Sequence, residues 1–159
     1  MARSEKRLIL LAGGGTGGHI FPNMAVLESA LRQAESFDVE VEAHFLVSDR
    51  PLDQRIVRDA DYRCTALNAT GLSLRPIRLA RFATGYLRSR QSVLKLIRQY
   101  RSEDAQRRIV MVASGGFVCG PSVDAARALR VPTAMVNLDV VAGKANRLLA
   151  ARVDRVFSC

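Results

Sequence analysis

The sequence is poor in the features that mark a specialised class of protein. It has only three cysteines, Cys64, Cys119 and Cys159, and their spacing matches no zinc-ligand motif. An odd number of cysteines does not suit a disulfide scaffold, so we expect structural thiols in a reducing cytosol. The apolar run at residues 8–12 is too short for a secretory signal, and no run approaches the roughly 20 apolar residues that a membrane-spanning helix needs. We therefore expect any membrane contact to be peripheral.

Acidic residues are missing from residues 75–101, which contain seven arginines and Lys95. Most of the formal net charge of +9 is concentrated there, and the rest of the chain is nearly balanced. Such a local charge predicts an anionic partner, which could be a membrane, a phosphorylated substrate or a nucleic acid. No aromatic-rich RNA-binding motif accompanies the arginines, so we do not expect nucleic acid.

Apolar runs and helical patterns alternate along the 159 residues, of which 48% are apolar and 25% charged. Strands are predicted at residues 8–12, 39–47, 62–67, 109–113, 132–137 and 153–158, and helices at residues 21–34, 52–59, 77–100, 121–129 and 144–151. The third helix is predicted either as one segment or as two segments broken near Gly85. This order is typical of a single α/β domain with a doubly wound, Rossmann-like parallel sheet.

Two glycine-rich segments follow the first and fourth predicted strands. Residues 13–19 read Gly-Gly-Gly-Thr-Gly-Gly-His, and residues 115–121 read Gly-Gly-Phe-Val-Cys-Gly-Pro. In a doubly wound sheet both segments lie at the carboxyl edge of the strands, where ligands bind. Glycines let main-chain N–H groups approach an anion, and the helix that follows each segment favours negative charge at its start. The pair therefore predicts an anion site.

A dinucleotide site is an alternative, because Gly13, Gly15 and Gly18 fit the pattern G-x-G-x-x-G. Such a site needs an acidic residue about 20 residues past the motif, at the end of the second strand. Asp38 precedes that strand, and Asp49 lies later than expected. A nucleotide-binding oxidoreductase fragment stays open as an alternative.

The glycine segments and several shorter matches resemble the MurG family of glycosyltransferases, of the GT-B, family 28 type. The shorter matches are Phe21-Pro22, Gly71-Leu72, Gly143 and residues 146–150. The resemblance covers nearly the whole chain but only the N-terminal half of the family's two-domain fold. It implies an acceptor-binding domain at residues 1–159, with the donor-binding domain absent from this chain and supplied in cis or in trans. The isolated chain is then expected to bind but not to transfer.

The resemblance implies an inverting hexosyltransferase that needs no metal or other cofactor. Its substrates would be a UDP-sugar donor, UDP-N-acetylglucosamine, and a polyprenyl-diphosphate-linked sugar acceptor of peptidoglycan synthesis. His19 is implied as the base, since imidazole groups titrate near neutral pH. The acceptor diphosphate is expected against Gly14, Gly15, Gly115, Gly116, Phe117 and Gly120. The donor is expected to face Thr16, Gly17, Gly18 and Asp139.

The chain departs from the family pattern after the fifth strand. It reads Val-Asn-Leu-Asp at residues 136–139, where the family has His-Glu-Gln-Asn. Asn137 cannot act as a base, and Asp139 brings a negative charge toward a nucleotide diphosphate. Cys119 replaces a residue that is usually serine. These departures keep a second function open, that of a non-catalytic membrane-docking subunit that recruits a separate donor-binding chain. His44 shows no partner in the sequence and is predicted to be structural.

A membrane patch is predicted where the loop before the third helix joins it. Its members alternate between apolar and basic residues, as in an interfacial anchor, and they are Leu74, Arg75, Ile77, Arg78, Leu79, Arg81 and Phe82. Members of the MurG family contact the cytoplasmic leaflet in this region, which implies a cytoplasmic protein that is peripheral on the inner face of the membrane. The alternative is an ordinary amphipathic helix, whose apolar stripe (Phe82, Tyr86, Val93, Ile97, Tyr100) lies on the core and whose basic residues (Arg81, Arg88, Lys95) are solvated.

Overall fold

The computed structural model describes residues 5–15, 18–68, 71, 76–139 and 143–158, without the side chains of Pro76, Arg78 and Lys144. Six parallel strands form one sheet in the order β3-β2-β1-β4-β5-β6. The strands are β1 (Glu5–Gly13), β2 (Val39–Ser48), β3 (Arg63–Leu67), β4 (Arg108–Gly115), β5 (Thr133–Asn137) and β6 (Arg155–Ser158). The helices are α1 (Ile20–Glu35), α2 (Pro51–Asp59), α3 (Pro76–Glu103), α4 (Cys119–Ala128) and α5 (Lys144–Ala150).

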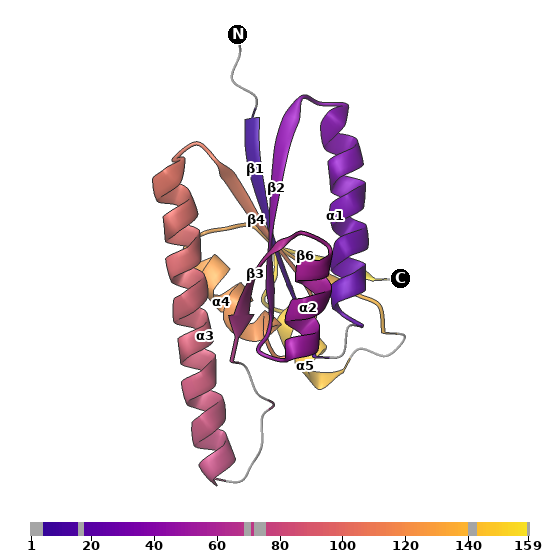
Figure 1. The fold of residues 1–159 in the computed structure, drawn as a ribbon. Helices are drawn as coiled ribbons and strands as arrows, with labels where there is room; N and C mark the ends of the chain where they lie inside the picture. Colours follow the sequence, from indigo (N-terminus) through magenta and orange to yellow (C-terminus); the bar gives the residue numbers. More distant parts are fainter. Residues whose placement is uncertain (1–4, 16–17, 69–70, 72–75, 140–142, 159) are drawn as a thin grey trace.

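Helices cover both faces of the sheet, which confirms the predicted doubly wound fold. Figure 1 shows α1 and α2 on one side of the strands and α3 and α4 on the other. The central strand β1 contributes to two separate cores. Leu8 and Leu10 pack with α3 and α4, whereas Ile9 and Leu11 pack with α1. A strand that is buried on both faces reads as a continuous apolar run, which explains the sequence of β1.

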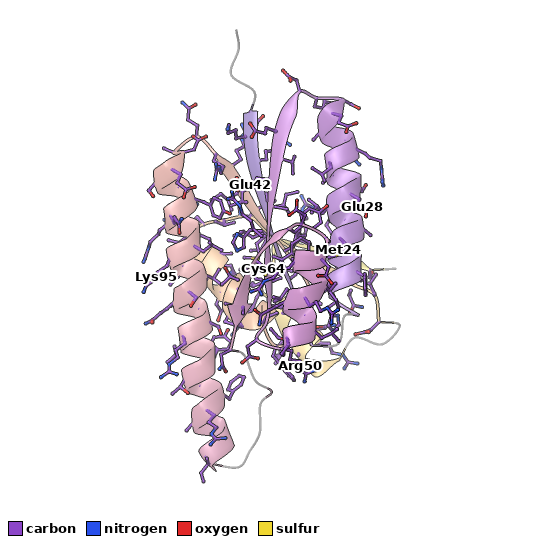
Figure 2. The ribbon with its side chains drawn as sticks, viewed as in Figure 1. Met24, Glu28, Glu42, Arg50, Cys64 and Lys95 are labelled. Atoms are coloured by element: carbon purple, nitrogen blue, oxygen red, sulfur yellow. The ribbon has the colours of Figure 1, made fainter. Side chains whose placement is uncertain are left out.

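Helix α3 is continuous over 28 residues, so the predicted alternative of a break near Gly85 is wrong. The glycine serves a packing role instead. A Cβ atom at Gly85 would lie 2.5 Å from the carbonyl oxygen of Asn68, which follows β3. The helix buries Val93 and Ile97 against the core, and Figure 2 shows Lys95 on the side that faces away from the sheet. This division confirms the amphipathic pattern predicted for the C-terminal half of α3.

His44 is a structural residue, as predicted. Its side chain is buried in β2, where Nδ1 lies 2.9 Å from the Tyr100 hydroxyl and Nε2 lies 2.8 Å from Oγ1 of Thr65. Burial, with a smaller contribution from the Arg63 guanidinium, lowers the pKa of His44 to about 4. The imidazole is therefore neutral in the folded protein at neutral pH.

Candidate functional site

The two glycine segments meet at the carboxyl edge of the sheet. Gly13 at the end of β1 is paired with Gly115 at the end of the neighbouring strand β4. The backbone φ angle is +130° at Gly115 and +87° at Gly116, values that residues with a side chain rarely adopt. A Cβ atom on Gly116 would also overlap the carbonyl oxygen of Gly14. Glycine is thus required here both for backbone conformation and for the close approach of the two turns.

His19 lies against the second glycine turn, which is formed by Gly115 and Gly116 at the end of β4. It is the N-cap residue of α1 but makes no side-chain capping hydrogen bond. A Cβ atom on Gly115 would lie 2.7 Å from Cε1 and 2.8 Å from Nδ1 of His19, so the imidazole rests against the bare backbone of that glycine. The Ser114 hydroxyl donates a hydrogen bond of 2.6 Å to the His19 carbonyl oxygen. The structure therefore brings the proposed base and both glycine turns together.

The buried thiol of Cys119 stabilises the second glycine turn through hydrogen bonds to its backbone. Its thiol lies 2.9 Å from the carbonyl oxygen of Gly115 and 3.2 Å from that of Ala12. The Gly115 N–H donates to Sγ at 3.3 Å. Burial raises the pKa of the Cys119 thiol to about 12, so the group stays protonated. This confirms the structural role predicted for Cys119, in a position where a serine hydroxyl would make similar contacts.

The first glycine turn is held by residues from the end of β2, the start of α2 and the short connection between them. The Gly15 N–H donates a 2.7 Å hydrogen bond to Oδ2 of Asp53, and Arg50 donates to the Gly15 carbonyl oxygen. The Ser48 hydroxyl donates to the same carboxylate oxygen of Asp53. Sequence reasoning missed these residues because Asp53 lies 38 positions from Gly15. The only available signal was the polar cluster directly after the second predicted strand, at the same edge of the sheet.

The two remaining residues of the predicted acceptor site face different directions. Phe117 is 55% exposed, and its ring lies so close to Gly71 that a Cβ atom there would come within 2.8 Å of Cζ. Gly120 instead packs against α3, because a Cβ atom on it would lie 3.1 Å from Cε2 of Tyr86. Phe117 is thus available to a ligand, and Gly120 contributes to helix packing.

Two of the predicted donor-facing residues, Thr16 and Gly17, lie outside the described residues. Gly18 is exposed just before α1. Asp139 follows β5, and its Oδ2 accepts a 3.2 Å hydrogen bond from Nδ2 of Asn146 on α5. Asn137 accepts from the same amide at 3.2 Å and donates to the Asp139 carbonyl oxygen at 2.9 Å. The departure from the family pattern is therefore accommodated by one hydrogen-bonded network between β5 and α5.

The structure weakens the sequence-based case against a dinucleotide site. Strand β2 extends to Ser48, so Asp49 follows directly after its carboxyl end. An acidic residue that binds a ribose lies at this position in dinucleotide-binding folds. The position of Asp49 after the strand thus fits a dinucleotide site, but Asp49 lies 31 residues past Gly18 and not about 20, so the spacing still argues against such a site. In the described part of the chain, no three His, Cys, Asp or Glu side chains converge as a metal site would require.

The predicted membrane patch is only partly described. Leu74 and Arg75 lie outside the described residues, as does the side chain of Arg78. Ile77 and Leu79 are 73% and 45% exposed, and Arg81 is also exposed. Phe82 is half-buried beside the Tyr86 ring, with 5.8 Å between ring centroids. Figure 1 shows that the first turns of α3 extend beyond the carboxyl ends of the strands. No helix among the described residues is long and apolar enough to cross a membrane.

Solved structures share this architecture. A crystal structure of MurG from Acinetobacter baumannii superposes with a TM-score of 0.75 at 24% identity, covering 97% of this chain and 41% of that one. A UDP-glucosyltransferase from Polygonum tinctorium superposes with a TM-score of 0.60 at 17% identity, covering 88% of this chain and 31% of that one. At these identities the likeness concerns the fold, and it covers less than half of each of the larger proteins.

Sequence relatives extend the comparison. Two of them carry the name UDP-N-acetylglucosamine–N-acetylmuramyl-(pentapeptide) pyrophosphoryl-undecaprenol N-acetylglucosamine transferase. The protein from Syntrophus aciditrophicus is 33% identical over 150 residues, and that from Geobacter sulfurreducens is 30% identical over 154. Each alignment covers 94% of this chain but only 39% and 38% of the relative. The family model for the glycosyltransferase family 28 N-terminal domain matches residues 9–158. The chain therefore belongs to the glycosyltransferase family 28 N-terminal domain family.

Proposed function

We propose that this chain forms the acceptor-binding half of an enzyme that transfers N-acetylglucosamine from UDP to a polyprenyl-diphosphate-linked sugar of peptidoglycan synthesis. The names of the relatives from Syntrophus and Geobacter support the reaction class. The observation that carries the assignment is the contact between the two glycine turns, with the His19 imidazole lying against Gly115. Anion binding and proton transfer would then take place within one small region.

The acceptor diphosphate fits the edge where the two turns meet. Helices α1 and α4 both begin there, and each helix start presents unpaired N–H groups and a partial positive charge. Apart from its neighbours in the chain, no described residue lies within 4 Å of the position that a Cβ atom at Gly15 would take. A charged group can therefore approach this side of Gly15 without displacing a described side chain.

His19 is the residue that we assign to proton transfer. In an inverting transfer the acceptor hydroxyl attacks the anomeric carbon of the donor sugar, and the bond from that carbon to the UDP oxygen breaks with its electron pair. The hydroxyl proton must leave during this step, and a neutral imidazole can accept it. Asn137 cannot replace His19 in this role, because an amide is not a base and its own amide is hydrogen-bonded to Asn146 and the Asp139 backbone.

We further propose that the start of α3 docks on the anionic inner face of the membrane, where a lipid-linked acceptor resides. Ile77 and Leu79 expose apolar side chains at the end of the domain that carries the glycine turns. Arg81 and the other basic residues of the segment 75–101 supply the charge. The same surface explains why a long helix keeps large apolar side chains in solvent.

A transfer assay tests the proposed reaction. The chain is supplied with a donor-binding domain, in the same polypeptide or as a separate chain, and UDP release is followed with UDP-N-acetylglucosamine and a solubilised diphosphate-linked muramyl acceptor. We expect UDP release that depends on the acceptor. The alternative of a non-catalytic docking subunit is favoured by Asn137 and Asp139, and it predicts vesicle binding without any acceptor-dependent UDP release.

A vesicle-binding measurement tests the membrane surface separately. The double substitution Ile77→Ser and Leu79→Ser removes about 2 kcal/mol of apolar burial, which is about a 30-fold loss of partitioning into anionic vesicles. Phe37→Ser is the matched control, because Phe37 is 75% exposed and follows the C-terminal end of α1, whereas the first glycine turn precedes the N-terminal end of that helix. Equal loss in both variants, or equal binding of the wild-type chain to neutral vesicles, would contradict this surface.

A further inference from the structure

We propose that Asp53 and Arg50 are positioning residues that fix the shape of the first glycine turn for the diphosphate. This inference rests on the proposed function and adds a part of the chain to which neither sequence motif points. Arg50 is the N-cap residue of α2 and Asp53 lies in the first turn of that helix, and both side chains reach the backbone of Gly15. Figure 2 shows Arg50 at the lower end of α2, at the edge of the sheet that carries the glycine turns.

Asp53 and Arg50 together bind both polar backbone groups of Gly15. Its N–H donates to Oδ2 of Asp53 at 2.7 Å, and its carbonyl oxygen accepts from the Arg50 guanidinium. The φ angle of Gly15 is +121°, a conformation that glycine adopts but that residues with a side chain rarely do. Ser48, the last residue of β2, also packs on Gly14, since a Cβ atom on Gly14 would lie 2.8 Å from the Ser48 nitrogen. Asp53 and Arg50 thus fix both polar backbone groups of Gly15, and no described residue beyond its chain neighbours lies within 4 Å of a Cβ atom built on it.

Stability alone does not account for Asp53. Its side chain is only 1% exposed, and a buried carboxylate is costly unless it is fully hydrogen-bonded. Oδ2 accepts from Gly15 and Ser48, but Oδ1 has no hydrogen-bond partner. An incompletely satisfied buried acid beside an anion site therefore calls for a functional reason. Holding the Gly15 N–H gives that reason, because it sets the direction of the backbone that follows.

This arrangement changes the expected contribution of Gly15 to ligand binding. Because its N–H already donates to Asp53, Gly15 does not offer that group to a phosphate. It contributes its shape and the open space above it, and the phosphate oxygens must take their hydrogen bonds from other N–H groups of the turns. The negative charge of Asp53 would by itself weaken the binding of an anion. Loss of the hydrogen bond to Gly15 is therefore expected to weaken anion binding, whereas loss of the charge alone is expected to strengthen it.

The experiment measures binding of inorganic pyrophosphate to the chain by titration calorimetry, together with the amide NMR signal and hydrogen exchange of Gly15. Asp53→Ala is expected to weaken pyrophosphate binding at least tenfold and to speed exchange of the Gly15 amide. Asp53→Asn keeps an acceptor oxygen for that amide and should bind within threefold of wild type or more tightly. Asp59→Asn is the matched control, because Asp59 lies on the same helix in an exposed ion pair with Arg55, and it should change neither readout.

Arg50→Gln is a second test in which misfolding is not expected, since Arg50 is exposed and its loss leaves the core intact. It should weaken pyrophosphate binding without changing the urea midpoint. Wild-type affinity in both Asp53→Ala and Arg50→Gln would overturn the inference, as would an Asp53→Asn variant as weak as Asp53→Ala. Absence of pyrophosphate binding by the wild-type chain would instead contradict the proposed function itself. In that case hydrogen exchange still tests the inference, because unchanged exchange of the Gly15 amide in Asp53→Ala would exclude the positioning role.

Discussion

Lowering the pH from 7 to 4.5 should remove the stabilisation that the buried, neutral His44 contributes to this domain. The folded protein keeps the imidazole neutral, with a pKa of about 4 that is lowered first by burial and then by Arg63. In the unfolded chain the pKa returns to its ordinary value of 6.5. The unfolded state therefore binds more protons between pH 6.5 and 4. The stabilisation is complete above pH 6.5 and is lost as the pH falls toward 4.

The size of the effect follows from the two pKa values. One pKa unit corresponds to about 1.4 kcal/mol, so the full shift is worth about 3 kcal/mol, and most of this is lost between pH 7 and pH 4.5. That is a large part of the roughly 5–15 kcal/mol that stabilises a typical domain. The neutral ring is held in place by Tyr100 and Thr65, at 2.9 Å and 2.8 Å.

Urea unfolding at the two pH values measures this contribution. The wild-type domain is compared with His44→Asn, which cannot titrate but keeps a polar side chain. Carboxylates such as Asp154 titrate in both proteins, so their effects cancel in the comparison. We expect the variant to lose about 2 kcal/mol less than the wild type between pH 7 and pH 4.5. An equal loss in both proteins, or an NMR titration of His44 with a midpoint near 6.5, would refute the reasoning.

Three further predictions concern the glycine turns and their surroundings. Gly116→Ala should lower the free energy of unfolding in urea by about 2 kcal/mol or more, because of its φ of +87° and the nearby Gly14 carbonyl. Gly143→Ala, with open space around it, should stay within about 1 kcal/mol. Iodoacetamide at pH 8 should leave Cys119 unmodified in the native protein, since its pKa is about 12, and equal labelling of the partly exposed Cys64 and Cys119 by mass spectrometry would contradict this. Titration calorimetry should detect no binding of NADH, and saturable micromolar binding would restore the dinucleotide reading.

The alternation of strands and helices could be predicted because each element carries its own signal. The buried run of β1 and the glycine turns that follow β1 and β4 are local patterns, and parallel topology places both turns at one edge. Local patterns failed where a glycine acts at a distance. Gly85 suggested a break in α3, yet it accommodates the Asn68 carbonyl, and no local pattern indicated that Gly120 packs on Tyr86.

The support of the site could not be predicted from the sequence. Ser114 holds the His19 carbonyl across 95 positions, and Asp53 holds Gly15 across 38. Such pairs depend on the register of neighbouring strands and on the length of the connections, neither of which periodicity reveals. A polar residue directly after a predicted strand indicates a position at the carboxyl edge of the sheet, where ligands bind. Its hydrogen-bond partner can be identified only from the three-dimensional structure.

The central claim is that the glycine turns bind the acceptor diphosphate while His19 accepts the proton of the attacking hydroxyl. It is tested most directly by His19→Ala in a protein that includes a donor-binding domain, with turnover and acceptor affinity measured on the same sample. We predict that turnover falls by about 10²–10⁴-fold, whereas the acceptor dissociation constant changes by less than about threefold. The substitution Gly116→Val should instead abolish acceptor binding, because its side chain would overlap the first turn. A loss of turnover below tenfold in His19→Ala would contradict the account.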